Sequence, residues 1–163
     1  MARNVYGLDL GSYEIKVYDK KKDSIWKEKD VIALKKENEI FAVGDDAFLM
    51  HEKAPSNIEV VFPMKEGVIS RFHDMQFLLQ NLLKKGHQFA RGSEYVVAVP
   101  TDVTEVEKKA FFDLVIHSTA RAKEVNIVER SIADAIGLNL DVQNTKGVFI
   151  VNFGGQTTEL SVI

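Results

Sequence analysis

Residues 5–19 form the stretch that most constrains the fold of this chain. An apolar run over residues 5–10 is interrupted by Asp9, the dipeptide Gly11-Ser12 follows, and residues 14–19 alternate between polar and apolar side chains. This pattern predicts a β-hairpin whose tight turn exposes backbone N–H groups beside one carboxylate and one hydroxyl. Such groups are suited to hold a phosphate chain and its Mg²⁺. The sequence therefore predicts a phosphate-binding turn near the N-terminus.

A related arrangement returns near the other end of the chain. Residues 148–153 are mostly apolar, Gly154-Gly155 interrupt the run, and Gln156 and Thr157 lead into a second alternating run. The two units, each a strand, a glycine turn and a strand, are the main functional signal in the sequence.

Composition excludes several classes of protein. The 163 residues suffice for one domain with a sizeable core, and the net charge of −3 provides no basic field, so we expect no nucleic-acid partner. The absence of cysteine excludes disulfides and thiolate metal sites. No apolar run approaches the roughly 20 residues that cross a bilayer, and no signal peptide precedes the first strand. We therefore expect a cytoplasmic protein.

The periodicity of the remaining chain predicts an α/β fold. Three early strands precede an alternation of strands and helices, which indicates a mixed sheet with covering helices. Helices are expected over residues 74–85, after a capping box at Thr104, and over residues 131–140. Nearly continuous apolar strands are expected over residues 94–100, covered on both faces of the sheet, and over residues 147–153.

Two subdomains are expected. Residues 31–61 carry shorter elements and more turn residues than the rest, with helical spacing over residues 45–53. We interpret them as a small α+β subdomain inserted into a large one, which comprises residues 1–30 and 62–163 and carries the phosphate-binding sheet.

Five segments, taken in order, resemble one known family. They are Gly7-Leu8-Asp9-Leu10-Gly11-Ser12, Pro63-Met64-Lys65-Glu66-Gly67-Val68-Ile69, Val99-Pro100 with Val103-Thr104-Glu105-Val106-Glu107, Val128-Glu129 with Ala133 and Ala135-Ile136-Gly137, and Gly154-Gly155 with Thr157-Thr158-Glu159. Together they are similar to the actin-like ATPase superfamily, and most closely to the bacterial MreB family. The Asp9-Leu10-Gly11-Ser12 turn alone is weak, but all five segments in order over the whole chain are specific.

The resemblance implies a fold and a function. It implies the first lobe of a ribonuclease H-like, actin-like ATPase, whose second lobe is absent from this chain. It implies that ATP and Mg²⁺ bind between the two lobes and that the protein self-associates into filaments. Those filaments would guide cell shape and cell-wall synthesis, with wall-synthesis and membrane-anchored morphogenesis proteins as partners, at the inner face of the membrane.

The resemblance also assigns roles to single residues. Asp9 would face Mg²⁺ and the attacking water, and Thr157 would lie beside the γ-phosphate. The simpler alternatives are that Asp9 caps a turn, that Lys16 is a solvated strand lysine and that Thr157 is only a good strand residue. The residues expected to contact the nucleotide are Gly11, Ser12, Tyr13, Lys16, Gly154, Gly155, Gln156 and Thr157.

Three positions depart from the family pattern. Asn152 stands where the family usually has a metal-facing aspartate, and an amide carries no charge to neutralise Mg²⁺. Arg130 aligns with the catalytic glutamate that positions water, although a one-residue shift would give that role to Glu129. Gln156 replaces a third glycine. We therefore expect nucleotide binding with slowed hydrolysis, and ATPase activity stays open.

Two other functions were weighed against a filament. One is a non-polymerising actin-like adaptor in pilus assembly or cell division that uses nucleotide as a switch. The other is a small-molecule kinase of the same superfamily. Contact with a membrane surface would have to use the loop over residues 86–91, where only Phe89 and Ala90 are apolar, so we expect such contact to be weak.

Overall fold

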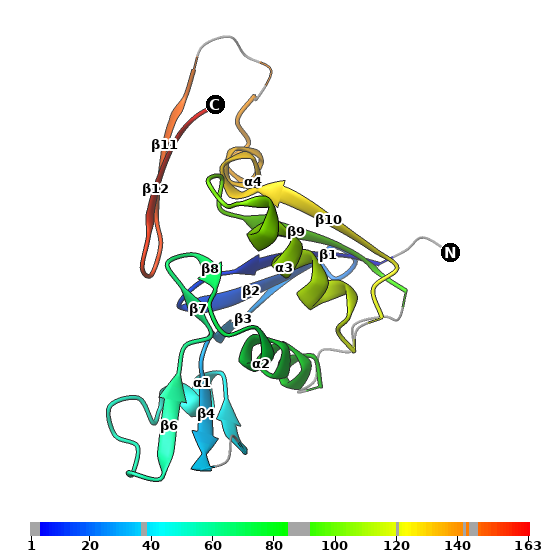
Figure 1. The fold of residues 1–163 in the computed structure, drawn as a ribbon. Helices are drawn as coiled ribbons and strands as arrows, with labels where there is room; N and C mark the ends of the chain where they lie inside the picture. Colours follow the sequence, from blue (N-terminus) through cyan, green and yellow to red (C-terminus); the bar gives the residue numbers. More distant parts are fainter. Residues whose placement is uncertain (1–3, 37–38, 85–91, 120, 142, 144–146) are drawn as a thin grey trace.

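The computed structural model describes residues 4–36, 39–84, 92–119, 121–141, 143 and 147–163 of the chain. Its centre is a five-stranded sheet in the order β10-β9-β1-β2-β3 (Figure 1). The strands are β1 (Val5–Leu10), β2 (Glu14–Asp19), β3 (Ser24–Lys29), β9 (Glu94–Val99) and β10 (Glu124–Glu129). β1 runs antiparallel to β2 and parallel to β9, so the predicted mixed sheet is confirmed.

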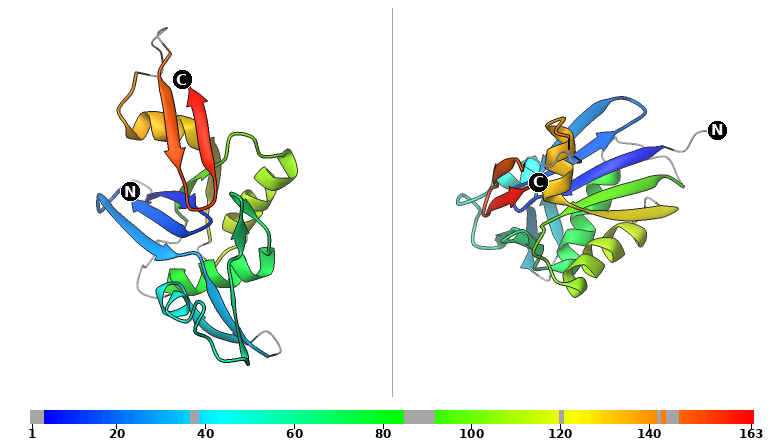
Figure 2. Two further views of the ribbon diagram at one scale, coloured as in Figure 1. Left: turned by 90° about the vertical axis from the view of Figure 1, so that its left-hand side faces the viewer. Right: turned by 90° about the horizontal axis from the view of Figure 1, so that it is seen from above.

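Two helices, α2 (Phe72–Lys84) and α3 (Glu105–Ile116), cover one face of this sheet (Figures 1 and 2). In β1, Tyr6, Leu8 and Leu10 are buried in alternation with half-buried residues, which marks the face that the helices cover. The helices bury Met75, Leu78, Leu79, Leu82, Phe111, Leu114 and Val115. The predicted helix over residues 74–85 begins two residues earlier than expected, at Phe72, and residue 85 lies outside the described residues. The capping box at Thr104 is present.

The opposite face of the sheet is covered only in part, because helix α4 (Arg130–Gly137) contacts β9 and β10 there. Gly7, Val96 and Ala98, from neighbouring strands β1 and β9, line a shallow apolar pocket there. Tyr95 and Val97 are buried in the core, whereas Val96 between them is only half-buried. The prediction that this strand is covered on both faces therefore holds for Ala98, which is 9% exposed, and not for Val96.

A separate three-stranded antiparallel sheet, in the order β5-β4-β6, lies between Ile32 and Val61. It comprises β4 (Ile32–Lys35), β5 (Ile40–Val43) and β6 (Ile58–Val61), and a small core of Val31, Ala33 and Ala47 packs it against α1 (Asp45–Phe48). α1 is shorter than the helix predicted over residues 45–53, because turns follow Phe48 and Glu52 takes a positive φ of 60°. The division of the chain into two subdomains stays a prediction.

The last two strands lie apart from the main sheet (Figure 1). β11 (Phe149–Phe153) and β12 (Thr158–Val162) pair with each other, next to helix α4 (Arg130–Gly137). Phe153 is 80% exposed and Val162 is 71% exposed, and Ile150 is the buried residue of β11. The buried strand predicted over residues 147–153 is therefore wrong, because no described element covers the outer face of this hairpin. The helix predicted over residues 131–140 is also shorter than expected.

Candidate functional site

The turn between β1 and β2 forms one side of the site. The Gly11 N–H donates to the Glu14 carbonyl oxygen at 3.2 Å, and a Cβ on Gly11 would lie 2.8 Å from that same oxygen. This turn therefore needs a residue without a side chain at Gly11. Ser12 follows it and is buried. The local sequence pattern and the geometry agree here.

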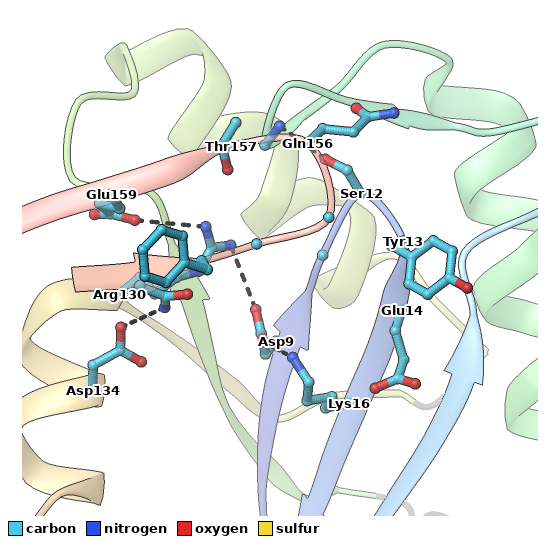
Figure 3. A pocket seen from close by; sticks show the side chains of 16 residues that line it. Asp9, Ser12, Tyr13, Glu14, Lys16, Arg130, Asp134, Gln156, Thr157 and Glu159 are labelled. Carbon is cyan, nitrogen blue, oxygen red and sulfur yellow. Dashed lines mark hydrogen bonds and ion pairs between the residues drawn. The ribbon is translucent and has the colours of Figure 1, made fainter.

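The turn between β11 and β12 repeats this arrangement. The Gly154 N–H donates to the Thr157 carbonyl oxygen at 2.8 Å, and a Cβ on Gly154 would lie 2.9 Å from that oxygen. At the next position, a Cβ on Gly155 would lie 2.5 Å from the Cβ of Tyr13. The two glycine turns, from opposite ends of the chain, are thus in contact at their tips (Figure 3).

A third, smaller hairpin ties the two turns together. It consists of β7 (Met64–Lys65) and β8 (Val68–Ile69), joined through Glu66 and Gly67, which both have positive φ angles. The Gly67 N–H donates to Ser12 Oγ at 2.9 Å, and the Glu66 N–H donates to Gln156 Oε1 at 2.8 Å. One backbone turn thus holds a side chain from each glycine turn.

These turns enclose an open pocket of about 390 Å³. Its lining residues are Asp9, Gly11, Ser12, Tyr13, Glu14, Lys16, Gly67, Arg130, Asp134, Asn152, Phe153, Gly154, Gly155, Gln156, Thr157 and Glu159. The structure therefore brings together every residue predicted for the site except Glu129. That residue ends β10, is exposed and does not line the pocket, whereas its neighbour Arg130 does.

A charged network crosses the floor of the pocket (Figure 3). Lys16 Nζ lies 2.8 Å from Asp9 Oδ2, and Arg130 Nη2 lies 3.4 Å from Asp9 Oδ1. Arg130 Nη1 lies 3.7 Å from Glu159 Oε2, so the guanidinium lies between two carboxylates. The Asp9 carboxylate is thus flanked by two cations, one at each oxygen.

Sequence analysis missed Glu159 as a site residue. Its carboxylate accepts hydrogen bonds from the Thr101 hydroxyl at 2.6 Å and from the Thr101 N–H at 3.2 Å, besides its pairing with Arg130. The pairing register of the predicted second hairpin could have identified Glu159. Asn152 and Glu159 are paired across β11 and β12, so the two side chains share the face that lines the pocket.

The structure places the Asn152 side chain against helix α4. Its Nδ2 donates to Asp134 Oδ2 at 2.6 Å, so the amide is oriented by an acceptor on the helix. Asp134 was not predicted as a site residue. Together the two side chains connect the second hairpin to α4.

A buried carboxylic acid lies beside the first turn, outside the pocket lining. Asp30 is fully buried, and its N–H donates to the Tyr13 carbonyl oxygen at 3.0 Å. Neither of its carboxylate oxygens has a hydrogen-bond partner among the described residues. Burial raises the pKa of Asp30 to about 8, because removal from water disfavours the charged form. Asp30 is therefore a neutral acid over most of the physiological range.

Residues 3–163, nearly the entire chain, match the family model described as "MreB/Mbl protein". The chain belongs to the MreB/Mbl family. A protein named cell shape-determining protein MreB from Pasteurella multocida is 37% identical over 98% of the chain, and its Escherichia coli K12 counterpart is 36% identical over 100%. These matches cover 47% and 49% of the two relatives, so this MreB/Mbl chain spans about half of their length.

Solved structures agree with this membership. MreB5 of Spiroplasma citri bound to ADP matches 99% of this chain and 48% of its own, with a TM-score of 0.88 and 27% identity. The AMPPNP complex of MreB5 gives a TM-score of 0.87. The MamK double helical filament shares the fold, with a TM-score of 0.81 at 20% identity. The predicted actin-like α/β fold is therefore confirmed.

The residues of this MreB/Mbl chain do not match a Mg²⁺ site at Asp9. Both Asp9 oxygens already face cations, and Asn152 brings an amide instead of a second carboxylate. In the described part of the chain, no group of three or more His, Cys, Asp and Glu side chains is arranged to hold a metal ion. The described helices also include none with the length and apolar character needed to cross a membrane.

Proposed function

We propose that this chain is the first lobe of an MreB-type, ATP-binding protein that assembles into filaments and helps to determine cell shape. The observation that carries the proposal is the contact between two glycine turns around one pocket. The glycines of both turns, Ser12 and Lys16 all line that pocket, and glycine turns, hydroxyls and ammonium groups are suited to phosphate. These are the groups with which proteins bind phosphate chains.

Several contacts support a nucleotide as the ligand. Ser12 Oγ accepts a hydrogen bond from Gly67, which leaves its own O–H free to donate to a phosphate oxygen. The Lys16 side chain is 44% exposed, so its ammonium group is accessible from the pocket. The similar MreB5 structures hold ADP and AMPPNP. Gly11, Tyr13, Gly154, Gly155, Gln156 and Thr157 would complete the phosphate-binding surface.

A second lobe would complete this site. Phe149, Val151 and Phe153 lie on one face of β11, opposite Val162, Leu160 and Thr158 of β12. This face is largely apolar and exposed, and a two-stranded hairpin is only marginally stable by itself. Further chain packed on that face would bury it and supply the adenosine side of the pocket. The isolated chain should therefore bind nucleotide weakly.

Hydrolysis would be slow in this protein. Arg130 lies in the pocket where the family carries a water-positioning glutamate, and its charge is opposite. Of the residues expected to be catalytic, Asp9 and Thr157 line the pocket and Glu129 does not. Asp9 forms ion pairs with Lys16 and Arg130, and these two cations would compete with the attacking water for its carboxylate.

Family membership supports the following proposed cellular role. Filaments at the inner face of the membrane would guide cell-wall synthesis together with membrane-anchored morphogenesis proteins, and the cytoplasm would be the compartment. The loop predicted to approach the membrane, with Phe89 and Ala90, lies outside the described residues. Nucleic acid is not among the proposed partners, given the net charge of −3.

Calorimetry with ADP and sedimentation with ATP test this proposal on the full-length protein. We expect saturable ADP binding and a pelleted fraction that rises with protein concentration. Binding without pelleting would favour the non-polymerising adaptor. Absence of binding would overturn the nucleotide-dependent function, and phosphate transfer to a sugar in a coupled assay would point to the small-molecule kinase.

A further inference from the structure

We propose that the pocket binds the phosphates of a nucleotide without a divalent metal ion, using Lys16 and Arg130 as the cations that meet the phosphate charge. This inference rests on the proposed nucleotide-binding function and concerns what neutralises the nucleotide. It follows from three features of the pocket: the state of Asp9, the balance of charge and the unfilled hydrogen-bond donors.

The first feature is that Asp9 is already paired on both sides. Lys16 Nζ lies 2.8 Å from one carboxylate oxygen and Arg130 Nη2 lies 3.4 Å from the other. A metal ion that approached Asp9 would have to displace at least one of these cations and would be repelled by the other. A guanidinium keeps its charge at any ordinary pH, so deprotonation cannot free the Asp9 site.

The second feature is charge balance across the pocket floor. Lys16 and Arg130 match the charges of Asp9 and Glu159, and Asn152 adds none. The remaining carboxylates also have partners. Glu14 lies 3.8 Å from Lys27 Nζ and 3.7 Å from Lys29 Nζ, and Asp134 accepts from the Asn152 amide. With Lys27 and Lys29 counted, four cations thus offset the four carboxylates of the pocket lining, so no metal ion is needed to neutralise them.

The third feature is the supply of free donors. Arg130 Nη2 faces Asp9 Oδ1 at 3.4 Å but forms no hydrogen bond with any described residue, and the Arg130 side chain lines the pocket and is 12% exposed. The Lys16 ammonium has three N–H donors, of which Asp9 accepts one. Arginine and lysine donors to phosphate oxygens are among the stronger hydrogen bonds in proteins. A buried donor without an acceptor is costly, so an entering phosphate oxygen would relieve that cost.

The test compares ADP binding to the full-length protein in excess EDTA and in excess Mg²⁺, measured by calorimetry. We expect the affinity in EDTA to equal or exceed that in Mg²⁺. Loss of binding in EDTA, with binding in Mg²⁺, would overturn this inference and leave the nucleotide-binding function standing. Absence of binding in both buffers would instead overturn the nucleotide-binding function together with it.

Single substitutions test whether the two pocket cations bind the phosphates, as distinct from a general effect of the protein's charge on ADP affinity. Arg130→Gln should weaken metal-free ADP binding by about 10- to 100-fold, the equivalent of one charge-assisted hydrogen bond. It should also make binding stronger in Mg²⁺ than in EDTA, because Asp9 would become free on one side. Unchanged metal-free affinity in this variant would contradict the inference.

Arg71→Gln is the matched control. It removes an arginine that pairs with Glu59 and Asp74 outside the pocket, so ADP binding should stay the same in both buffers. Lys16→Gln serves as the second variant if circular dichroism shows that Arg130→Gln is unfolded. Because Lys16 is partly exposed, its replacement should leave the fold intact and weaken metal-free binding over the same range.

Discussion

Gly155 and Tyr13 are in contact across two hairpins: a Cβ built on the glycine would lie 2.5 Å from the tyrosine Cβ. Real Cβ atoms essentially never approach so closely, so the site tolerates only glycine at this position unless a hairpin moves. This contact places two turns from opposite ends of the chain on one pocket. The Gly155–Tyr13 distance therefore sets how far apart the phosphate-binding groups lie.

Gly155→Ala should separate the two turns and weaken ADP binding to the full-length protein. The added methyl group would meet the Tyr13 Cβ and backbone, which cannot yield as the end of a flexible side chain would. Overpacking of this kind typically costs about 1–3 kcal/mol. Thermal unfolding would report the loss of stability, and calorimetry would report the loss of affinity.

Gly137→Ala provides the control for that prediction. Nothing lies within 4 Å of a Cβ built on Gly137, at the end of α4. This variant should keep the stability of the native protein, or gain up to about 1 kcal/mol from a less flexible unfolded chain. Equal effects of the two substitutions on ADP affinity would contradict the assigned role of the Gly155 contact.

Ser12→Ala should destabilise the protein by about 1–3 kcal/mol. The reason is that the buried Gly67 N–H would lose its acceptor, Ser12 Oγ, while remaining shielded from water. Chemical denaturation measures this free energy of unfolding. Ser24→Ala, at the exposed start of β3, is the matched control and should change stability by less than about 0.5 kcal/mol. A neutral Ser12 variant would show that the Gly67 contact is dispensable.

The two glycine turns were predictable because their signal is local. A strand, a glycine-containing turn and an alternating run specify a hairpin through backbone sterics and side-chain alternation, without information from elsewhere in the chain. The pocket residues of these turns, such as Gly11 and Gly154, were accordingly found from sequence. The helix start at Thr104 was found for the same reason, since a capping box involves only neighbouring residues.

The charged network was not predictable, because it depends on contacts between distant segments. Sequence placed Arg130 at the catalytic position but could not show that it pairs with both Asp9 and Glu159. The prediction of buried strands failed for a similar reason. An apolar run such as β11 reads as buried whether or not another element covers it, and the described chain leaves Phe153 exposed.

The stability of the protein should fall as pH rises between about 4 and about 8 because of Asp30. In the unfolded chain this carboxylic acid loses its proton near its ordinary pKa, whereas in the folded chain burial raises the pKa to about 8. The folded state thus holds one more proton over this interval, which costs about 1 kcal/mol per pH unit as pH rises. Above about pH 8 both states are ionised and this contribution levels off.

Asp30→Asn should remove that slope, since an amide of nearly the same shape does not ionise. Denaturation at pH 5 and pH 8 measures this pH dependence. The variant should be more stable than the wild type at pH 8 and nearly as stable as the wild type at pH 5. Asp102→Asn, at an exposed position, is the control and should keep the wild-type slope. Parallel pH profiles for the wild type and Asp30→Asn would refute the role given to burial.

Val162→Thr should affect the full-length protein more than the 163-residue chain. In the chain, Val162 is 71% exposed, and replacement by an isosteric polar residue should change stability by less than about 0.5 kcal/mol. In the full-length protein, a second lobe packed on β12 would bury the hydroxyl at a cost of about 1–3 kcal/mol. Val106→Thr, at a 79% exposed position of α3, should be neutral in both. Equal effects of Val162→Thr in both forms would argue against a lobe on this face.

Phosphate release by the full-length protein should be slow. A group that positions the attacking water typically contributes 10²–10⁴-fold in rate, and here Arg130 occupies the place of the family's glutamate while pairing with Asp9. A family member that carries the glutamate is the reference, assayed at the same filament concentration so that polymerisation does not confound the rates. Turnover equal to that of the reference would show that another group, with Glu129 as the first candidate, positions the water.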